Sequence, residues 1–137
     1  MLDGIEFVED GQVDAKQLND LYRQIGWDKT GRRTDAETVE MLTRSFFTIA
    51  AWEGELLVGF ARVCGDLYCV QVLDVITREG YRRRGIATRC MEHVVKHLKK
   101  SNYVSVTLTD GTGFDHFYED FEFKEIDVPS RVWRPRF

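Results

Sequence analysis

The sequence has no long apolar run and few cysteines, and each absence argues against a class of protein. No apolar stretch approaches the roughly 20 residues that a membrane-spanning helix needs. Asp3 and Glu6 interrupt the start of the chain, so no charged-then-apolar leader opens it, and we expect a cytoplasmic protein. Cys64, Cys69 and Cys90 are an odd number without Cys-x-x-Cys spacing, which argues against a disulfide framework or a zinc site. We interpret them as structural thiols.

Basic residues are in the minority, which argues against a nucleic-acid-binding protein. The chain carries 19 Lys or Arg against 23 Asp or Glu, a net charge of −4. Residues 78–100 alone carry eight Lys or Arg and two Glu, a net charge of +6, so the rest of the chain carries −10. A basic island in an acidic chain favours one localised anionic ligand, because nucleic-acid surfaces spread Lys and Arg over a whole face. We expect this ligand to be a phosphorylated small molecule.

The remaining composition is that of an ordinary globular protein. With 137 residues, 43% hydrophobic and 31% charged, the chain is long enough for one domain with a sizeable core, and we predict a single domain over residues 1–137. Runs of β-branched and aromatic residues, separated by turn residues, predict strands at 5–8, 46–52, 56–63, 67–76, 103–108, 123–128 and 132–137.

Helices are predicted from caps and apolar periodicity. Asp14 precedes a helical pattern and serves as its N-cap. Thr34-x-x-Glu37 is a capping box, and it predicts a second helix with Val39 and Leu42 facing inward. A short helix is expected around Phe117, late in the chain.

The segment around which the chain is organised is the basic, glycine-bearing turn at 80–88. Apolar residues after it recur at the spacing of one helical face: Ile86, Ala87, Met91, Val94, Val95 and Leu98. A helix therefore begins near Gly85, and its first N–H groups and positive dipole end form an anion site. Gly85 lets a phosphate come close, and Ala87 is small enough for tight packing on a strand. We interpret this turn as a pyrophosphate cradle.

Two motifs resemble those of one family. Arg82-x-x-Gly85-x-Ala87, after a strand and before a helix, resembles the Arg/Gln-x-x-Gly-x-Gly/Ala signature of the GNAT superfamily of acetyl-CoA-dependent N-acetyltransferases. Residues 117–123, Phe-Tyr-Glu-Asp-Phe-Glu-Phe, resemble its Phe-Tyr-Glu-x-x-Gly-Phe segment. The resemblance implies a small single-domain member with an α/β, GNAT-like acyl-CoA N-acyltransferase fold. Its central sheet is mixed and mostly antiparallel, with about six or seven strands and about four helices in the order β-α-α-β-β-β-α-β-α-β.

The same resemblance implies acetyl-CoA as the co-substrate. Its pantetheine arm is expected to pair with the backbone of Val75, Ile76 and Thr77, in the manner of strand addition. The pyrophosphate is expected at the backbone N–H groups and side chains of the cradle, which we take as Arg82, Arg83, Arg84, Gly85, Ile86, Ala87 and Thr88. No metal is expected, because His93 and His97 lack the Glu that follows the first His of a zinc-binding helix.

Acetyl transfer to an amine needs a neutral amine, a polarised carbonyl and a proton for the leaving thiolate. Tyr118 occupies the position of the family's acid tyrosine and is the candidate proton donor. Asp74 could accept the amine proton, directly or through water, with Asp66 and Glu79 as poorer candidates. Asp74 could equally hold a loop or a bulge, and neutral amine could enter unaided. A backbone N–H near Val75 is expected to polarise the carbonyl.

The acceptor is predicted from charge late in the chain. Acidic residues cluster there and favour a cationic amine: Asp110, Asp115, Glu119, Asp120, Glu122, Glu125 and Asp127. We therefore predict transfer to a small, cationic primary amine in a ternary complex, with a peptide or protein terminus as a second possibility. A rival hypothesis from another class is a catalytically silent acyl-CoA-binding regulatory module. No nucleic-acid or membrane partner is expected, and a homodimer is left open.

Overall fold

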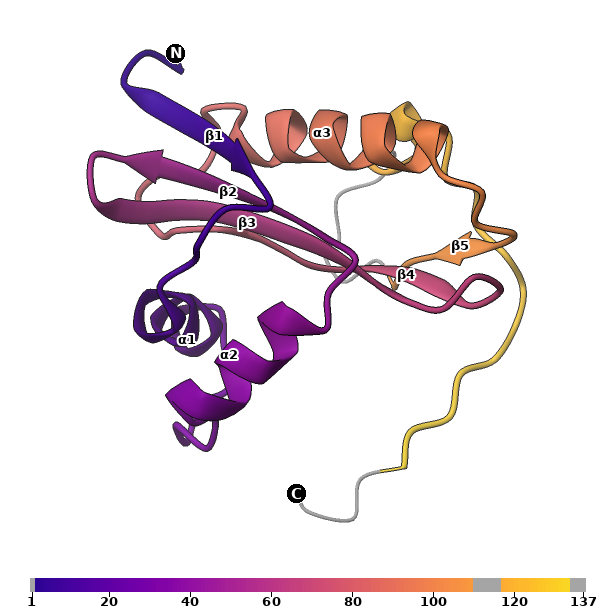
Figure 1. The fold of residues 1–137 in the computed structure, drawn as a ribbon, viewed down its shortest axis with the longest axis horizontal. Helices are drawn as coiled ribbons and strands as arrows, with labels where there is room; N and C mark the ends of the chain where they lie inside the picture. The colour runs from indigo at the N-terminus through magenta and orange to yellow at the C-terminus, as the bar shows by residue number, and fades with distance from the viewer. Residues whose placement is uncertain (1, 110–116, 134–137) are drawn as a thin grey trace.

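The computed structural model describes residues 2–109 and 117–133, which form a sheet with helices on both faces (Figure 1). The elements occur in the order β1 (Ile5–Glu9), α1 (Ala15–Gln24), α2 (Asp35–Thr43), β2 (Phe47–Glu53), β3 (Leu56–Gly65), β4 (Val70–Thr77), α3 (Ile86–Lys100), β5 (Val106–Thr107) and the 3-10 helix η1 (Glu119–Phe121). The strand order is β1-β2-β3-β4-β5, antiparallel except for the parallel pair β4–β5. The prediction of a mixed, mostly antiparallel sheet is confirmed.

The first two helices begin where their capping residues predict. The Asp14 side chain accepts a hydrogen bond of 3.0 Å from the Lys16 N–H, and Thr34 and Glu37 form the predicted capping box. Val39, however, is 52% exposed, so the prediction that it faces inward is wrong. The buried position in that turn is Thr38, whose hydroxyl donates a 2.6 Å hydrogen bond to Asn19 Oδ1 and so joins α2 to α1.

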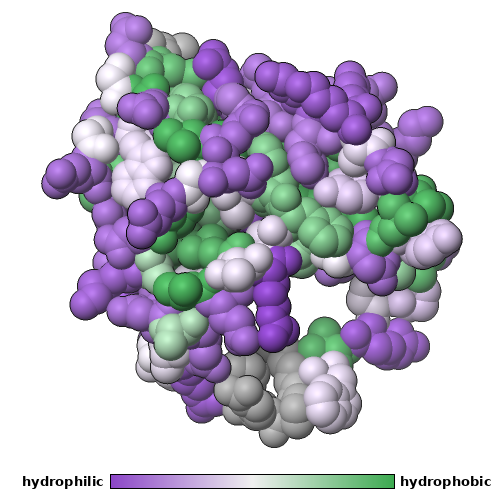
Figure 2. All heavy atoms as spheres, in the orientation of Figure 1, coloured by the Kyte–Doolittle hydropathy of each residue, from purple (hydrophilic) through white to green (hydrophobic). Residues whose placement is uncertain are grey.

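The helices cover opposite faces of the sheet, with α3 on one face and α1 and α2 on the other (Figure 1). The α3 side buries one row of side chains, namely Ile86, Cys90, Met91 and Val94. The α1 side buries a second cluster, which joins Leu18, Leu21 and Tyr22 to Ala50, Leu57, Phe60 and Ile76. Hydrophilic side chains cover the outer surface of α3 (upper right in Figure 2), as its period predicts.

Close packing between α3 and the sheet depends on Gly59 of β3. A Cβ atom at this position would lie 2.4 Å from Cγ2 of Ile86 and 3.2 Å from Cβ of Ala51, so only glycine fits without a shift of its neighbours. Ile86 is 1% exposed and makes the contact with the strand. Gly59 is therefore a small residue that allows tight packing here, and sequence reasoning, which considered only Ala87, missed it.

The C-terminal part of the fold differs from the prediction. The structure describes five strands and three α-helices, fewer than the predicted six or seven strands and about four helices. The predicted strand at 103–108 is reduced to β5, and residues 123–133 form no strand; residues 134–137 lie outside the described part of the chain. Only η1 represents the predicted short helix among the described residues. Two features disfavour a strand at 123–133: Pro129 has no backbone N–H to donate to a sheet, and the two-residue β5 offers only a short edge for pairing.

Candidate functional site

A β-bulge interrupts β4 at Asp74 and Val75. The register between β3 and β4 shifts between Phe60 and Arg62, because Asp74 and Val75 together lie opposite Ala61. Asp74 has a φ of 57°, a left-handed value that residues with a Cβ atom rarely adopt. The bulge therefore redirects the backbone N–H groups of β4 at the point where the sequence places the reacting carbonyl.

The strands β4 and β5 separate close to this bulge. Their ladder consists of the pairs Val70–Val106 and Gln71–Thr107, and no further pair joins the two strands within the described residues. From Val72 onward, β4 thus has one edge without a strand partner in that part of the chain. An extended ligand can form backbone hydrogen bonds with such an edge.

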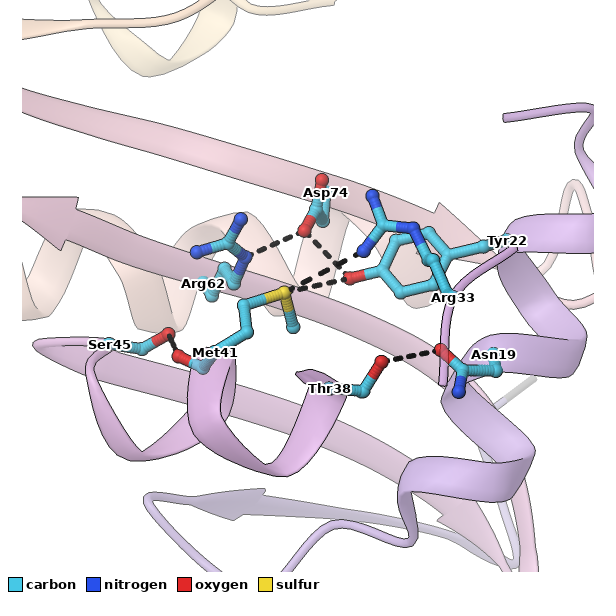
Figure 3. A network of polar contacts seen from close by, with 8 residues as sticks. All are labelled: Asn19, Tyr22, Arg33, Thr38, Met41, Ser45, Arg62 and Asp74. Carbon is cyan, nitrogen blue, oxygen red and sulfur yellow. Dashed lines mark hydrogen bonds and ion pairs between the residues drawn. The ribbon is translucent and has the colours of Figure 1, made fainter. Parts of the chain in front are cut away.

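Two donors hold the Asp74 side chain on the α1 face of the sheet (Figure 3). The Tyr22 hydroxyl donates a 2.7 Å hydrogen bond to Asp74 Oδ2, and Arg62 Nε donates to the same oxygen at 2.6 Å. The side chains of Arg62 and Asp74 are only 13% and 12% exposed. Burial, followed by the neighbouring Asp74 charge and hydrogen bond, raises the pKa of the Tyr22 hydroxyl far above its usual value, so it remains a donor.

The network continues from Tyr22 into α2 and the preceding loop. The Arg33 guanidinium lies over the Tyr22 ring, with its Cζ atom 3.8 Å from the ring centre. Met41 Sδ lies 3.7 Å from the Tyr22 hydroxyl oxygen and 3.8 Å from Arg33 Nη1 (Figure 3). Asp28 fixes this loop, because its two carboxylate oxygens accept hydrogen bonds from the Arg32 and Arg33 N–H groups.

The start of α3 is glycine-led and uncapped. Gly85 is its N-cap with a φ of 84°, and no side chain caps the helix, unlike α1 and α2. Arg83, two residues earlier, also has a positive φ, of 64°. A Cβ atom at Gly85 would meet nothing within 4 Å, so the space over the first-turn N–H groups is open. This geometry fits the predicted pyrophosphate cradle.

The arginines near the cradle divide into two groups. Arg78 Nε donates to the Leu57 carbonyl at 2.6 Å, Arg84 lies 5.1 Å from the centre of the Tyr81 ring, and Arg89 lies 5.6 Å from that of Phe7. Arg82 and Arg83 are exposed, and no carboxylate of the described chain lies within ion-pair distance of either one. These two side chains are therefore available to an anionic ligand.

Tyr118 immediately precedes η1 and belongs to the core cluster on the α3 side. Its ring makes edge contacts with Phe117 and Phe123. An open cavity of about 910 Å³ is lined largely by Tyr118 and residues within 119–130, together with α3 residues and with Gln71 and Thr107, the pair at which β4 and β5 separate. Tyr118 thus lies by the root of the strand split, whereas the Asp74 side chain lies on the opposite face of the sheet.

Sequence reasoning missed Tyr22, Arg62 and Arg33. Tyr22 has the spacing of an ordinary buried helix position, and its partner is 52 residues away. The one available signal was Arg62, a lone charge within the otherwise apolar strand β3. A charge in such a position requires a partner, although the sequence does not say which.

The chain matches one known protein family. The model of the acetyltransferase (GNAT) family matches residues 13–123, which is most of the chain. The chain belongs to the GNAT acetyltransferase family. A search of curated proteins gave no significant match.

Solved structures share this GNAT fold along nearly the whole chain. A protein from meticillin-resistant Staphylococcus aureus superposes with a TM-score of 0.79 at 20% identity, covering 97% of this chain and 99% of that one. A GNAT-family acetyltransferase from Streptococcus pneumoniae gives 0.75 at 24% identity, with the same coverage. An aminoglycoside acetyltransferase from an uncultured soil metagenomic sample gives 0.76 at 13% identity, covering 99% and 100%. At these identities the likeness shows the fold alone.

The described residues of this GNAT protein fit the co-substrate of the family, acetyl-CoA. The uncapped start of α3 offers N–H groups for phosphates, and the unpaired edge of β4 offers backbone groups for amides. Within residues 2–109 and 117–133, no group of three or more His, Cys, Asp or Glu side chains is arranged to hold a metal ion. No helix in the same residues is long and apolar enough to cross a membrane.

Proposed function

We propose that residues 1–137 form one N-acetyltransferase domain, which transfers the acetyl group of acetyl-CoA to a small primary amine by direct attack in a ternary complex. The observation that carries this proposal is the proximity of the uncapped, glycine-led start of α3 to the bulged, unpaired edge of β4. Ile86, the first residue of α3, packs against Gly59, which pairs with Thr77 at the end of β4. Membership of the GNAT family supports the acetyl donor. The fold shared with an aminoglycoside acetyltransferase supports an amine as acceptor.

In this proposal, two segments of the chain bind acetyl-CoA, one its pantetheine arm and the other its pyrophosphate. The backbone of Val75, Ile76 and Thr77 pairs with the amides of the pantetheine arm as an added strand. The pyrophosphate is held by the cradle, through the N–H groups of Arg83, Arg84, Gly85, Ile86, Ala87 and Thr88 and the exposed guanidinium groups of Arg82 and Arg83. The bound thioester supplies an acetyl group that an amine can attack.

Three groups of the chain then act on the reaction. A backbone N–H at Val75, in the bulge, polarises the carbonyl. Asp74 Oδ2 is occupied by Tyr22 and Arg62, whereas Oδ1 has no hydrogen-bond donor among the described residues and is not fully buried, so Oδ1 orients the amine and accepts its proton. The Tyr118 hydroxyl protonates the leaving thiolate.

The cationic character of the acceptor stays a prediction. Glu119, Asp120, Glu122, Glu125 and Asp127 are all exposed, and Asp110 and Asp115 lie outside the described residues. Their charge supports attraction of a cation to the surface near Tyr118 and does not bear on the surroundings of Asp74.

The first test is donor binding, measured by calorimetric titration with acetyl-CoA. We expect binding by the natural protein and its loss in Gly85→Glu, because a carboxylate would occupy the phosphate position. Gly54→Glu is the matched control, since Gly54 also has a positive φ, of 59°, and open space around its Cβ position, but lies in the β2–β3 turn. Equal loss of binding in both variants, or none in Gly85→Glu, would contradict the cradle.

The second test is transfer itself, with a panel of primary amines. We expect Tyr118→Phe to lower kcat by about 100-fold while acetyl-CoA binding is kept. Tyr68→Phe, at a 67% exposed position, is the control. Acetyl-CoA binding without transfer to any amine, and with Tyr118→Phe unchanged in every activity, would favour the silent acyl-CoA-binding module.

A further inference from the structure

Arg33 presents an uncommitted guanidinium group beside Asp74. Among the described residues, its guanidinium has one cation–π partner, the Tyr22 ring, and one hydrogen-bond acceptor, Met41 Sδ, and a thioether sulfur is a weak acceptor. No carboxylate of the described residues lies within ion-pair distance of this guanidinium. The Nε and Nη2 atoms of Arg33 have no hydrogen-bond partner among the described residues. Every fully buried side-chain nitrogen in that part of the chain has a hydrogen-bond partner, so these two atoms are not fully buried.

Arg62 adds further free donors at the same place. Only its Nε atom bonds to Asp74, so the N–H groups on Nη1 and Nη2 have no hydrogen-bond partner among the described residues. Figure 3 shows Arg33 and Arg62 on opposite sides of Asp74. Two guanidinium groups thus lie beside the Asp74 carboxylate, and the second nearby carboxylate, Asp28, is engaged by the backbone N–H groups of Arg32 and Arg33.

The position of Arg33 is fixed before any ligand binds. The Arg33 backbone N–H donates to Asp28 Oδ2 at 3.0 Å, and the guanidinium is stacked on a fully buried tyrosine ring. The same backbone hydrogen bond, with that from Arg32, lowers the pKa of Asp28, so its carboxylate stays charged while it holds the loop. An arginine held in this way loses less side-chain entropy on binding an anion.

We propose that Arg33 and Arg62 bind an oxyacid group of the acceptor, a carboxylate or a phosphate, while the amine of the same molecule lies at Asp74 Oδ1. The acceptor is then an amino acid or a phosphorylated small amine, and this inference rests on the proposed acetyl transfer. The planar guanidinium fork matches both kinds of oxyanion.

The transfer step balances with these groups. The amine nitrogen forms a bond to the acetyl carbon, and the carbon–sulfur bond breaks. The proton lost by the amine goes to Asp74 Oδ1 or to water, and the thiolate receives one from Tyr118. The oxyacid group takes no part in bond making, so it affects binding of the acceptor and leaves the chemical step unchanged.

The test uses matched pairs of acceptors that differ by the acid group. The carboxylate arm compares phenylalanine, tyrosine and histidine with phenethylamine, tyramine and histamine. The phosphate arm compares phosphoethanolamine with ethanolamine. We expect the acid-bearing member of at least one pair to be acetylated with a kcat/KM at least about tenfold above its partner. Absence of such a preference in every pair, whether the two members react equally or the amine without the acid is preferred, would overturn the inference.

Variants at Arg33 separate binding from structure. We expect Arg33→Gln to raise KM for the acid-bearing acceptor at least about tenfold, with kcat and the KM of the matched amine unchanged, and Arg33→Lys to restore part of the loss. Arg44→Gln is the control, because Arg44 is 78% exposed and paired with Glu40 on the same helix end. Equal changes for both members of a pair would show a merely structural role and overturn the inference.

A binding experiment tests the oxyacid site even if the proposed acetyl transfer is wrong. If acetyl-CoA binds but no amine is acetylated, the CoA-saturated protein is titrated with the same pairs. Binding of an acid-bearing member that Arg33→Gln abolishes would support the oxyacid site on its own. Absence of such binding in both arms would overturn it.

Discussion

The Tyr22 hydroxyl donates a 2.7 Å hydrogen bond to Asp74 Oδ2, and this contact joins α1 to the bulge of β4. Arg62 reaches the same oxygen from β3, so three elements meet at one carboxylate. Asp74, which has a positive φ, is thereby held by side chains from α1 and β3. The shape of the bulge depends on these contacts as well as on the strand itself.

Replacement of Tyr22 by Phe should weaken this arrangement. The change removes one donor to a largely buried carboxylate, and we expect the free energy of unfolding to fall by about 1.5 kcal/mol. Urea unfolding measures the loss, and kcat should fall with it because Asp74 becomes less fixed. Tyr68→Phe should change neither quantity, since Tyr68 is exposed. A Tyr22→Phe protein as stable as the natural one would contradict the role assigned to this hydroxyl.

A methyl group at Gly59 should destabilise the contact between β3 and α3. Its carbon would lie 2.4 Å from Ile86 Cγ2, and we expect Gly59→Ala to cost about 1–3 kcal/mol in urea unfolding. Ile86→Leu removes the offending γ-branch at similar volume. The double variant should therefore lose less than the sum of the single variants. Strict additivity would show that the strain arises from another neighbour.

Acid should weaken the contact between β1 and α3. His93 Nδ1 lies 2.6 Å from Glu9 Oε2, and this hydrogen bond is the largest cause that lowers the pKa of Glu9 below 4.5. A carboxyl with a lowered pKa stabilises the folded state above its unfolded pKa, and the contribution is lost as pH falls through the folded pKa. Urea unfolding of Glu9→Gln should then show a shallower decline of stability below pH 4.5 than the natural protein.

Some acid dependence should remain in Glu9→Gln. The pKa values of Asp28 and Asp66 are also lowered by backbone hydrogen bonds, and these contacts are unchanged in that variant. Parallel stability curves for the two proteins would contradict the assigned role of Glu9.

The three thiols should differ in reactivity. Burial raises the pKa of Cys90 to about 12, whereas Cys69 is exposed and Cys64 is partly buried. With a disulfide reagent at neutral pH, we expect Cys69 to react first and Cys90 only after unfolding, because the thiolate is the reactive form. Cys69→Ser should remove the fast phase. Rapid labelling of Cys90 in the folded protein would contradict its burial.

Local signals explain most of what the sequence predicted. The starts of α1 and α2 depend on contacts between neighbouring residues, namely the Asp14 cap and the Thr34–Glu37 capping box. The helical period of α3 is also visible in the sequence. The strand predicted from Leu67 begins at Val70, because Asp66 Oδ1 accepts the N–H groups of Tyr68 and Cys69 and turns the chain first.

Non-local contacts explain most of what it did not predict. The Tyr22–Asp74–Arg62 network joins residues that no spacing rule connects, and the contact of Gly59 with Ile86 depends on how a helix crosses the sheet. Alternation of apolar residues at 123–128 predicted a strand, but a strand also needs a partner edge, which sequence alone does not supply. Tyr118 was identified as the candidate proton donor through a family motif rather than through its own spacing.

The shared carboxylate at Asp74 also has an evolutionary consequence. Loss of Arg62 alone would leave a nearly buried negative charge, and loss of Asp74 alone would leave a nearly buried positive one. Sequence change at these two positions is therefore expected to occur in pairs, with Tyr22 restricting the choice further. New acceptor preferences would arise more readily in the loop before α2, because Arg33 contacts the Tyr22 ring and Met41 and makes no hydrogen bond or ion pair with Asp74.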